Sequence, residues 1–280
     1  MRRHRARQRV GDARVPVPEV VHGIDALARD HGRLFVVVGV FDGLHLGHAY
    51  LLRHLKTAAQ VRNARTAVIT FDHHPDEILI GSAPPLLCDP DDRLELLAEA
   101  GVDVTIVQTF DDALRMTPYD AFIRRIADRV DLAGLLMTPD AAFGHERKGT
   151  PDAVAALGAE LGYDVVVVPP MDLGGHPVRS GEIRAAIADG DLGRAAGMLG
   201  RPYVVRGFVD QAKATDVRLR FPMPVALPPH GEYRVRAGTD LDPSANARPD
   251  IADIDVNGIV HLRDGSFLAT STRVRVTFES

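Results

Sequence analysis

Short apolar runs alternate with longer stretches of helical pattern over the first two thirds of the chain. The runs lie at residues 34–40, 66–71, 104–108, 134–138 and 164–170. They are nearly continuous in hydrophobicity, which is typical of strands buried on both faces of a parallel sheet. Since parallel strands need crossover connections, the pattern predicts an α/β fold with a doubly wound parallel sheet. Ligands are expected at the carboxyl ends of its strands.

The predicted helices between these strands carry clear boundary signals. Asp89, Thr117 and Thr150 each stand directly before a proline, so each is a candidate N-cap ahead of proline at the first helical position. Gly101 and Gly162 follow two of these helices, where glycine accepts the left-handed conformation that ends a helix. These signals support helices between the strands.

The pattern changes after residue 200, where apolar and polar residues alternate in short segments separated by glycine and proline. Alternation with a period of two is typical of strands with one buried face. We therefore predict a parallel-sheet domain over residues 33–199, followed by a small antiparallel β-barrel-like domain over residues 200–280. Both are long enough to bury a core of their own.

Composition narrows the class of protein. The chain has 280 residues and a formal net charge of -5, so no overall positive field favours nucleic acid or an anionic membrane. No apolar run is long enough to span a membrane. A single cysteine, Cys88, excludes an internal disulfide and a cysteine-ligated metal site. We expect no dedicated metal site, no nucleic-acid or membrane partner, and a cytoplasmic location.

The N-terminal residues are strongly basic, with arginine at positions 2, 3, 5, 7, 9 and 14 against one acid, Asp12. No apolar periodicity accompanies this charge, so residues 1–32 are expected to form a flexible basic leader. A basic binding arm or an organelle transit peptide is the alternative interpretation.

The stretch GVFDGLHLGHAYLLRHL at residues 39–55 follows the first predicted strand and opens a helix. It carries Gly39, Gly43 and Gly47, with His45 and His48 three residues apart. This spacing is neither the dinucleotide-binding turn nor a Walker loop. The free N–H groups at a helix start favour an anion, to which both histidines can donate. In this interpretation Gly47 leaves room for the anion. Two exposed histidines without a ligand are the alternative.

A second candidate anion site lies near the end of the parallel-sheet domain. Ser180 begins a predicted helix, and Arg184 lies one turn later on the same face. A hydroxyl and a guanidinium in this arrangement can clamp a phosphate. The same pair also occurs in ordinary capped helices.

These segments resemble the flavin-nucleotide synthetase branch of the nucleotidylyltransferases. The resemblance begins at GVFDGLHLGH and continues through TFDHHP (70–75), residues 101–123, DAAFGHERKGT (140–150) and residues 178–209, in the order of the family. It covers about residues 34–210. Bacterial bifunctional riboflavin kinase/FAD synthetases are the most similar members.

The resemblance implies adenylyl transfer from ATP, accompanied by Mg²⁺, to FMN, with FAD and pyrophosphate as products. It assigns catalytic roles on the phosphates to His45, His48, Ser180 and Arg184. It assigns the nucleotide pocket to Gly39, Phe41, Asp42, Gly43 and Gly47. It assigns the flavin side to Phe71, His74 and Pro75.

Several positions depart from the family pattern. Arg179 and Gly181 flank Ser180 where hydroxyl residues are usual, and His73 replaces a proline. Ala141 and Ala142 replace bulkier residues. These changes affect the shaping of the substrate pocket more than the first phosphate site.

The C-terminal domain departs further from the riboflavin kinase module of the bifunctional enzymes. After Phe221, the residues Met223, Pro224 and Val225 stand where that module has threonine and asparagine ligands for magnesium-ATP. Their side chains offer no oxygen. The sequence ends at Ser280, before the expected helical end of the module. We expect a truncated, non-catalytic kinase-like domain without riboflavin kinase activity, which packs on the first domain or mediates self-association.

Three functions are therefore open at the level of sequence. The first is an FMN adenylyltransferase. The second is a related nucleotidylyltransferase with another phosphorylated acceptor, and the third is a non-catalytic flavin- or nucleotide-binding protein.

Overall fold

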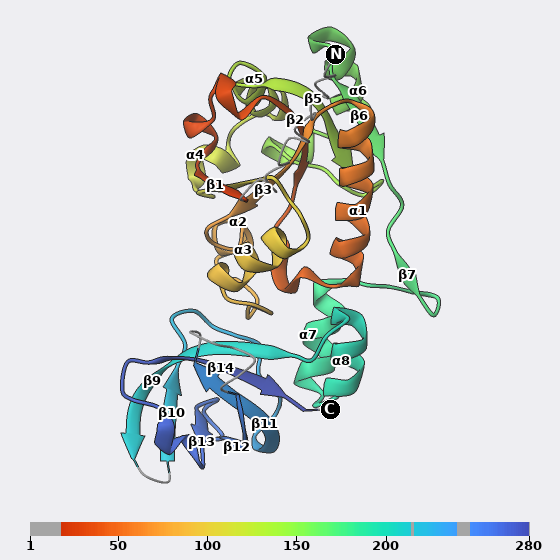
Figure 1. Cartoon of the computed structure of the whole chain (residues 1–280). Helices are drawn as coiled ribbons and strands as arrows, with labels where there is room; N and C mark the ends of the chain where they lie inside the picture. The colour runs from red at the N-terminus through yellow and green to blue at the C-terminus, as the bar shows by residue number, and fades with distance from the viewer. Residues whose placement is uncertain (1–17, 214–215, 240–246, 280) are drawn as a thin grey trace, which may run out of the picture.

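The computed structural model describes residues 18–213, 216–239 and 247–279. It contains a parallel sheet flanked by helices and a closed antiparallel barrel (Figure 1). The helices α7 (Ser180–Ala188) and α8 (Leu192–Leu199) lie beside the barrel, below the sheet in this view. The predicted fold class is confirmed.

The parallel sheet has six strands in the order β1-β4-β3-β2-β5-β6. From the central strand β2 the chain adds β3 and β4 on one side, and then crosses back to place β5 and β6 on the other. The crevice at a sheet's switch point, here between β2 and β5, is where doubly wound folds bind ligands. The strands are β1 Glu19–His22, β2 Arg33–Val38, β3 Arg65–Phe71, β4 Val104–Gln108, β5 Asp131–Met137 and β6 Asp164–Val167.

The helices of this part are α1 Leu46–Val61, α2 Asp76–Leu79, α3 Pro90–Glu99, α4 Asp112–Arg115, α5 Tyr119–Ala127 and α6 Pro151–Leu161. Two predicted N-caps are confirmed, because Asp89 and Thr150 accept backbone N–H groups of α3 and α6. The predicted cap at Thr117 is wrong. Its hydroxyl instead donates to the carbonyl of Ala113 at 2.8 Å, because α4 ends just before it.

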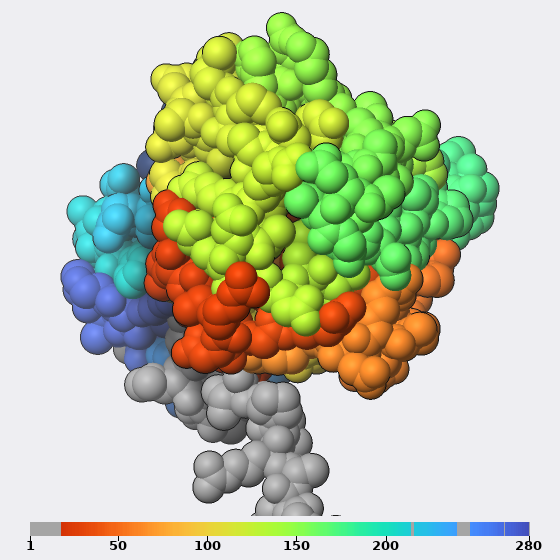
Figure 2. Space-filling view, turned by 90° about the horizontal axis from the view of Figure 1, so that it is seen from above, coloured from red at the N-terminus to blue at the C-terminus, as the bar shows by residue number. Residues whose placement is uncertain are grey.

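The N-terminal stretch requires a correction. Residues 19–32, expected in a flexible leader, form β1 and two short 3-10 helices. The backbone N–H of Ile24 donates to Gln108 at 2.9 Å, and Arg129 pairs with Asp25 at 2.6 Å. In Figure 2 this red stretch lies against the yellow-green segment that contains α5. The backbone of this stretch pairs with the edge of the sheet, and several of its apolar side chains are buried there. The arginine-rich residues 1–17 lie outside the described part.

The C-terminal barrel closes in the order β10-β13-β12-β11-β14-β9. Its strands alternate as the sequence predicts: Val274, Val276 and Phe278 of β14 are buried, and the residues between them are partly exposed. The strands are β9 Val204–Lys213, β10 Asp216–Arg220, β11 Gly231–Thr239, β12 Arg248–Ile254, β13 Val260–Leu262 and β14 Arg273–Phe278. A two-stranded hairpin, β7 Asp172–Leu173 and β8 His176–Pro177, precedes α7.

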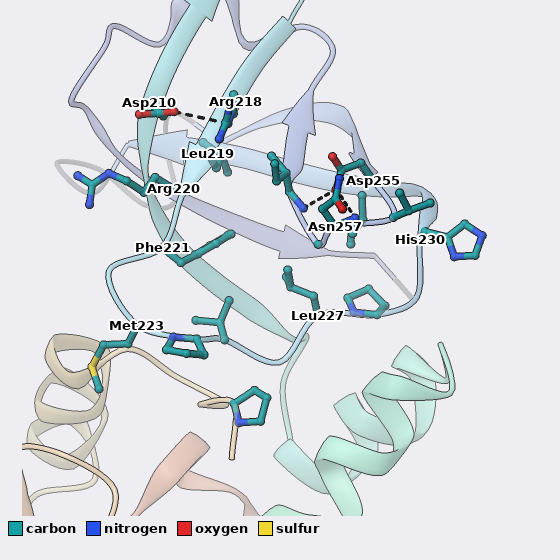
Figure 3. A pocket seen from close by; sticks show the side chains of 18 of the residues that line it. Asp210, Arg218, Leu219, Arg220, Phe221, Met223, Leu227, His230, Asp255 and Asn257 are labelled. Carbon is teal, nitrogen blue, oxygen red and sulfur yellow. Dashed lines mark hydrogen bonds and ion pairs between the residues drawn. The ribbon is translucent and has the colours of Figure 1, made fainter. Parts of the chain in front are cut away.

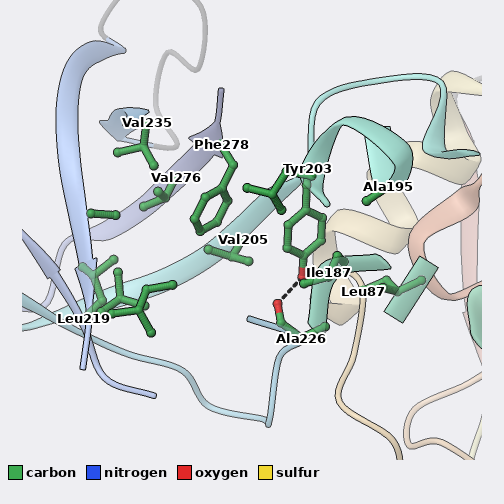
Figure 4. Close-up of a cluster of buried hydrophobic side chains, with 14 of the residues drawn as sticks. Leu87, Ile187, Ala195, Tyr203, Val205, Leu219, Ala226, Val235, Val276 and Phe278 are labelled. Atoms are coloured by element: carbon green, nitrogen blue, oxygen red, sulfur yellow. Dashed lines mark hydrogen bonds between the residues drawn. The ribbon is translucent and has the colours of Figure 1, made fainter. Parts of the chain in front are cut away.

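The helices α7 and α8, expected to belong to the first domain, share a hydrophobic core with the barrel. Ile187 and Ala195 belong to the same buried cluster as Tyr203, Val205 and Phe278, as Figure 4 shows. The apolar faces of the two helices meet the barrel because the chain passes directly from α8 into β9. The predicted boundary near residue 200 therefore does not separate two hydrophobic cores.

Charged side chains also join α3 to the barrel. Arg206 of β9 pairs with Asp92 at 2.5 Å and with Glu95 at 2.8 Å, and Arg275 of β14 pairs with the same two acids. Burial raises the pKa of Asp92 to about 6 although both arginines oppose the shift. Because such buried charges are costly without their partners, the two parts of the molecule are held in a defined arrangement.

Candidate functional site

The loop after β2 reverses sharply before α1. Phe41 has a left-handed backbone with φ 54°, and the 3-10 turn Asp42–Leu44 follows it. Gly39 lies where a Cβ atom would be 3.1 Å from the Phe41 ring. The glycine thus lets the Phe41 ring fold back against the strand end, and the turn brings His45 to the N-cap of α1.

His45 and His48 lie together at the start of α1. The rings stack with centroids 3.7 Å apart, and the backbone N–H of His48 donates to Nδ1 of His45 at 3.3 Å. Because Nδ1 of His45 accepts, the neutral ring carries its proton on Nε2. Among the described residues, Nδ1 of His48 is buried with no hydrogen-bond partner. The pair therefore includes one buried polar atom that these residues leave unsatisfied.

Both imidazoles are neutral at physiological pH. Burial, followed by the positive charges of Arg201 and Arg184, lowers the pKa of His45 from 6.5 to about 4. Burial and the neighbouring His45 lower the pKa of His48 well below its usual value. Each neutral ring thus carries one N–H group, and the positive charge near the pair comes from Arg201 and Arg184.

This low pKa predicts a pH dependence of stability. Unfolded His45 takes up a proton near pH 6.5, whereas folded His45 stays neutral down to about pH 4, so stability falls as the pH drops through this range. We expect His45 to account for a loss of about 2 kcal/mol in the free energy of unfolding between pH 7 and pH 4.5. Urea unfolding at several pH values measures it.

The control is His45→Asn, since asparagine keeps an N-cap oxygen without titrating. Its free energy of unfolding should fall less steeply with acid than that of the wild type. Parallel slopes for the two proteins would contradict the prediction.

Asp42 is the polar centre of the loop. Its carboxylate is 2 % exposed and accepts backbone N–H groups from Leu87 at 2.9 Å and Cys88 at 3.2 Å. Arg184 donates to it at 2.5 Å, and the Ser180 hydroxyl donates to the Asp42 carbonyl at 3.2 Å. The structure thus brings Ser180 and Arg184 to the loop of residues 39–48, which carries both histidines and is called the histidine loop below. The hydrogen bonds of both side chains go to the protein itself rather than into open space.

Two further arginines contact this loop, and sequence reasoning missed both. Arg93 donates to the carbonyl of Val40 at 3.1 Å, and Arg201 donates to that of Gly43 at 2.7 Å. With Arg184 they place three guanidinium groups behind the loop. Arg201 lies within residues 178–209, one of the segments that carry the family resemblance. No sequence signal distinguishes Arg93.

The role expected for Gly47 needs correction. A Cβ atom at Gly47 would be 2.8 Å from the carbonyl oxygen of Val178 and 3.1 Å from the His45 ring. Glycine is needed here because the segment before α7 packs directly on the start of α1. The space that it leaves is filled by the protein, and is not room for an anion.

The candidate flavin residues follow β3, which neighbours β2. Phe71 is buried and meets Phe110 edge to face at 5.4 Å. His74 accepts the backbone N–H of Asp76 at 3.2 Å, and burial lowers its pKa. Pro75 is the N-cap of α2. Because β2 and β3 are parallel neighbours, their following loops lie at the same edge of the sheet.

A separate cavity of about 770 Å³ lies at the barrel (Figure 3). Phe221, Met223 and Leu227 give it an apolar wall, and Asp255 and His230 also line it. The histidine loop does not contribute to its lining. Within the described ranges, no group of three or more His, Cys, Asp or Glu side chains is arranged to hold a metal ion. No described helix has the length and hydrophobicity to cross a membrane.

The parallel sheet with a histidine-bearing loop at its switch point, joined to a closed barrel, defines a nucleotidyltransferase-like α/β protein. A model of the FAD synthetase family matches residues 27–182. Since this match spans more than half of the 280 residues, the chain belongs to the FAD synthetase family.

Curated relatives are bifunctional riboflavin kinase/FMN adenylyltransferases. The protein from Haemophilus influenzae is 33 % identical over 67 % of this chain and 61 % of its own length. The one from Listeria monocytogenes is 29 % identical over 67 % of this chain and 60 % of its own length. The chain thus spans about three fifths of these relatives. The Escherichia coli protein is 29 % identical over 82 % of this chain and 78 % of its own length.

A solved structure described as a macrolide-efflux protein from Streptococcus pneumoniae has a similar fold. Its TM-score is 0.78 at 22 % identity, over 93 % of this chain and 89 % of that one. At this identity the likeness concerns the fold alone, and it extends over both the parallel sheet and the barrel.

Proposed function

We propose that the protein is an FMN adenylyltransferase, which transfers AMP from magnesium-ATP to FMN and yields FAD and pyrophosphate. The observation that carries this proposal is the pair of neutral histidines, His45 and His48, at the start of α1 in a member of the FAD synthetase family. Three guanidinium groups stand behind the loop that carries them. The names of the curated relatives support the same activity.

In the proposed reaction an oxygen of the FMN phosphate bonds to the α-phosphorus of ATP, and the bond from that phosphorus to the bridging oxygen of pyrophosphate breaks. The N–H groups of His45 and His48 donate to the phosphate oxygens as charge shifts to the leaving group. The helix start adds its own field. Mg²⁺ enters with ATP as part of the substrate.

The remaining site residues support these donors. Ser180 and Arg184 hold the histidine loop through Asp42, and Gly39, Phe41 and Gly43 shape its turn. Phe71, His74 and Pro75 are assigned to the flavin side, at the neighbouring strand end. We also place the protein in the cytoplasm, because a single cysteine suits a reducing compartment.

The proposal is tested by incubating the purified protein with ATP, MgCl₂ and FMN. FAD and pyrophosphate should accumulate in equal amounts, as resolved by flavin chromatography and a pyrophosphate assay. Pyrophosphate formed only with a different phosphorylated acceptor would favour another nucleotidylyltransferase. Flavin or ATP binding without turnover would favour a binding protein.

We further propose that the barrel does not phosphorylate riboflavin. Met223, Pro224 and Val225 stand at the position of the expected oxygen ligands and line the barrel cavity, and none supplies a side-chain oxygen for magnesium-ATP. With riboflavin, ATP and Mg²⁺, we expect no more FMN than in a heat-killed control. Steady FMN formation at the rate of FAD formation from FMN would contradict this proposal.

We also propose that the barrel mediates self-association. Sedimentation velocity tests this proposal, and a protein that sediments as a monomer at all concentrations would contradict it.

A further inference from the structure

The 85–88 segment lies between the barrel and the histidine loop. On the barrel side its backbone pairs like a short strand: Leu86 N–H donates to the carbonyl of Pro224 at 2.9 Å, and Ala226 N–H donates to that of Leu86 at 2.8 Å. Leu86 and Val225 form a parallel bridge. The segment belongs to the first domain in sequence, yet the barrel fixes its position.

The other side of the 85–88 segment holds the histidine loop. The backbone N–H groups of Leu87 and Cys88 both donate to the Asp42 carboxylate, and Gly43 N–H donates to Cys88 Sγ at 3.1 Å. The approach is so close that a Cβ atom at Gly43 would be 2.8 Å from that of Leu87. Asp42 and Gly43 form the turn that delivers His45 to its N-cap. Movement of the 85–88 segment therefore moves the histidines.

Tyr203 anchors the barrel side of this connection. Its hydroxyl donates to the Ala226 carbonyl at 2.6 Å, and its ring is 2 % exposed. Figure 4 shows the hydroxyl pointing at Ala226, with the side chain of Leu87 in the same cluster. An uninterrupted series of contacts thus runs from Tyr203 through Ala226, Leu86 and Leu87 to Asp42.

We propose that the barrel holds the histidine loop in its working geometry through the 85–88 segment, with Tyr203 as a positioning residue. The catalytic part of this inference rests on the proposed adenylyltransferase function. Because phosphoryl-group chemistry depends on donors held within a fraction of an ångström, a small displacement of the loop is sufficient to lower the rate. A barrel without kinase chemistry would thereby have a positive role in the reaction of the first domain.

The test compares two hydroxyl deletions in the barrel. Tyr203→Phe removes the hydrogen bond to Ala226, whereas Tyr233→Phe removes a hydrogen bond to the nearby Pro229 carbonyl and leaves the 85–88 segment alone. Amide hydrogen exchange of a peptide covering Leu87 and Cys88 reports on the segment without any need for activity. Steady-state kinetics of FAD formation report on the site.

For Tyr203→Phe we expect exchange at Leu87 and Cys88 about 3- to 10-fold faster than in the wild type, with a similar fall in kcat and an unchanged KM for FMN. Tyr233→Phe should match the wild type in all three. Unchanged exchange in Tyr203→Phe, or equal effects of both variants, would overturn the inference. A wild type that makes no FAD contradicts the proposed function, while the exchange comparison still tests the connection.

A second variant covers the case in which Tyr203→Phe fails to fold. Ala226→Pro removes the N–H that donates to Leu86, and Val225 before it forms a β-bridge with Leu86, which agrees with the extended conformation favoured before proline. Faster exchange at Leu87 and Cys88 with slower FAD formation is expected here too. Wild-type exchange in this variant would also overturn the inference.

Discussion

Replacing His48 by alanine is expected to lower kcat for FAD formation by about two to three orders of magnitude. The imidazole stacks on His45 and lies 4.9 Å, between centroids, from Phe41, so its orientation is fixed before substrate arrives. Removing a donor that is already oriented removes stabilisation specific to the transition state. The KM for FMN should change little, since the flavin residues follow a different strand.

The matched control is His54→Ala, a more exposed histidine farther along α1 that stacks edge to face on Tyr50. It should retain wild-type kcat and KM. Single-turnover measurements with excess protein separate the chemical step from product release. A His48→Ala protein with near-wild-type single-turnover rate would remove the phosphate role assigned to this histidine.

Asp42→Ala is expected to lower the free energy of unfolding by about 3 to 5 kcal/mol. The change leaves the Arg184 guanidinium, only 17 % exposed, without its charged partner. It also removes the acceptor of the Leu87 and Cys88 N–H groups, and buried donors without partners are costly. Urea unfolding followed by circular dichroism measures the loss.

Asp131→Ala provides the comparison, because Asp131 pairs with Arg33 at 3.0 Å on the surface, with both side chains about half exposed. That ion pair should contribute no more than about 1 kcal/mol. If the two aspartate variants lost equal stability, Asp42 would not be the buried anchor that its contacts indicate.

The sequence was sufficient to predict the regular parts of the fold. Strands buried on both faces must be continuously apolar, so runs such as 104–108 are recognisable without any knowledge of their neighbours. The edge strand β1 was missed because four residues, with one buried, carry too little pattern. The shared core of α7, α8 and the barrel was missed for another reason. The sequence pattern of a helix predicts which face is buried, but it does not predict which element packs against that face.

Some residues of the candidate site could be predicted from the sequence, and others could not. His45, His48 and the glycines of their loop are close in sequence, so their spacing alone indicates a helix start with donors. Arg93 and Arg201 act on backbone carbonyls, and a carbonyl is present at every residue. Such contacts do not require a particular residue type at the accepting position, so the sequence does not indicate them. Arg184 could be placed near the loop, but its pairing with buried Asp42 depends on the three-dimensional path of the chain.

The edge strand β1 also bears on how the protein is made. During synthesis residues 19–22 leave the ribosome long before β4, the strand beside which they pair. The inner strands β2 and β3 are synthesised before β4. They can therefore pair with each other before β4 is available to pair with β1. Among the described strands β1 is translated first, yet it can pair in the sheet only after β4 has been made.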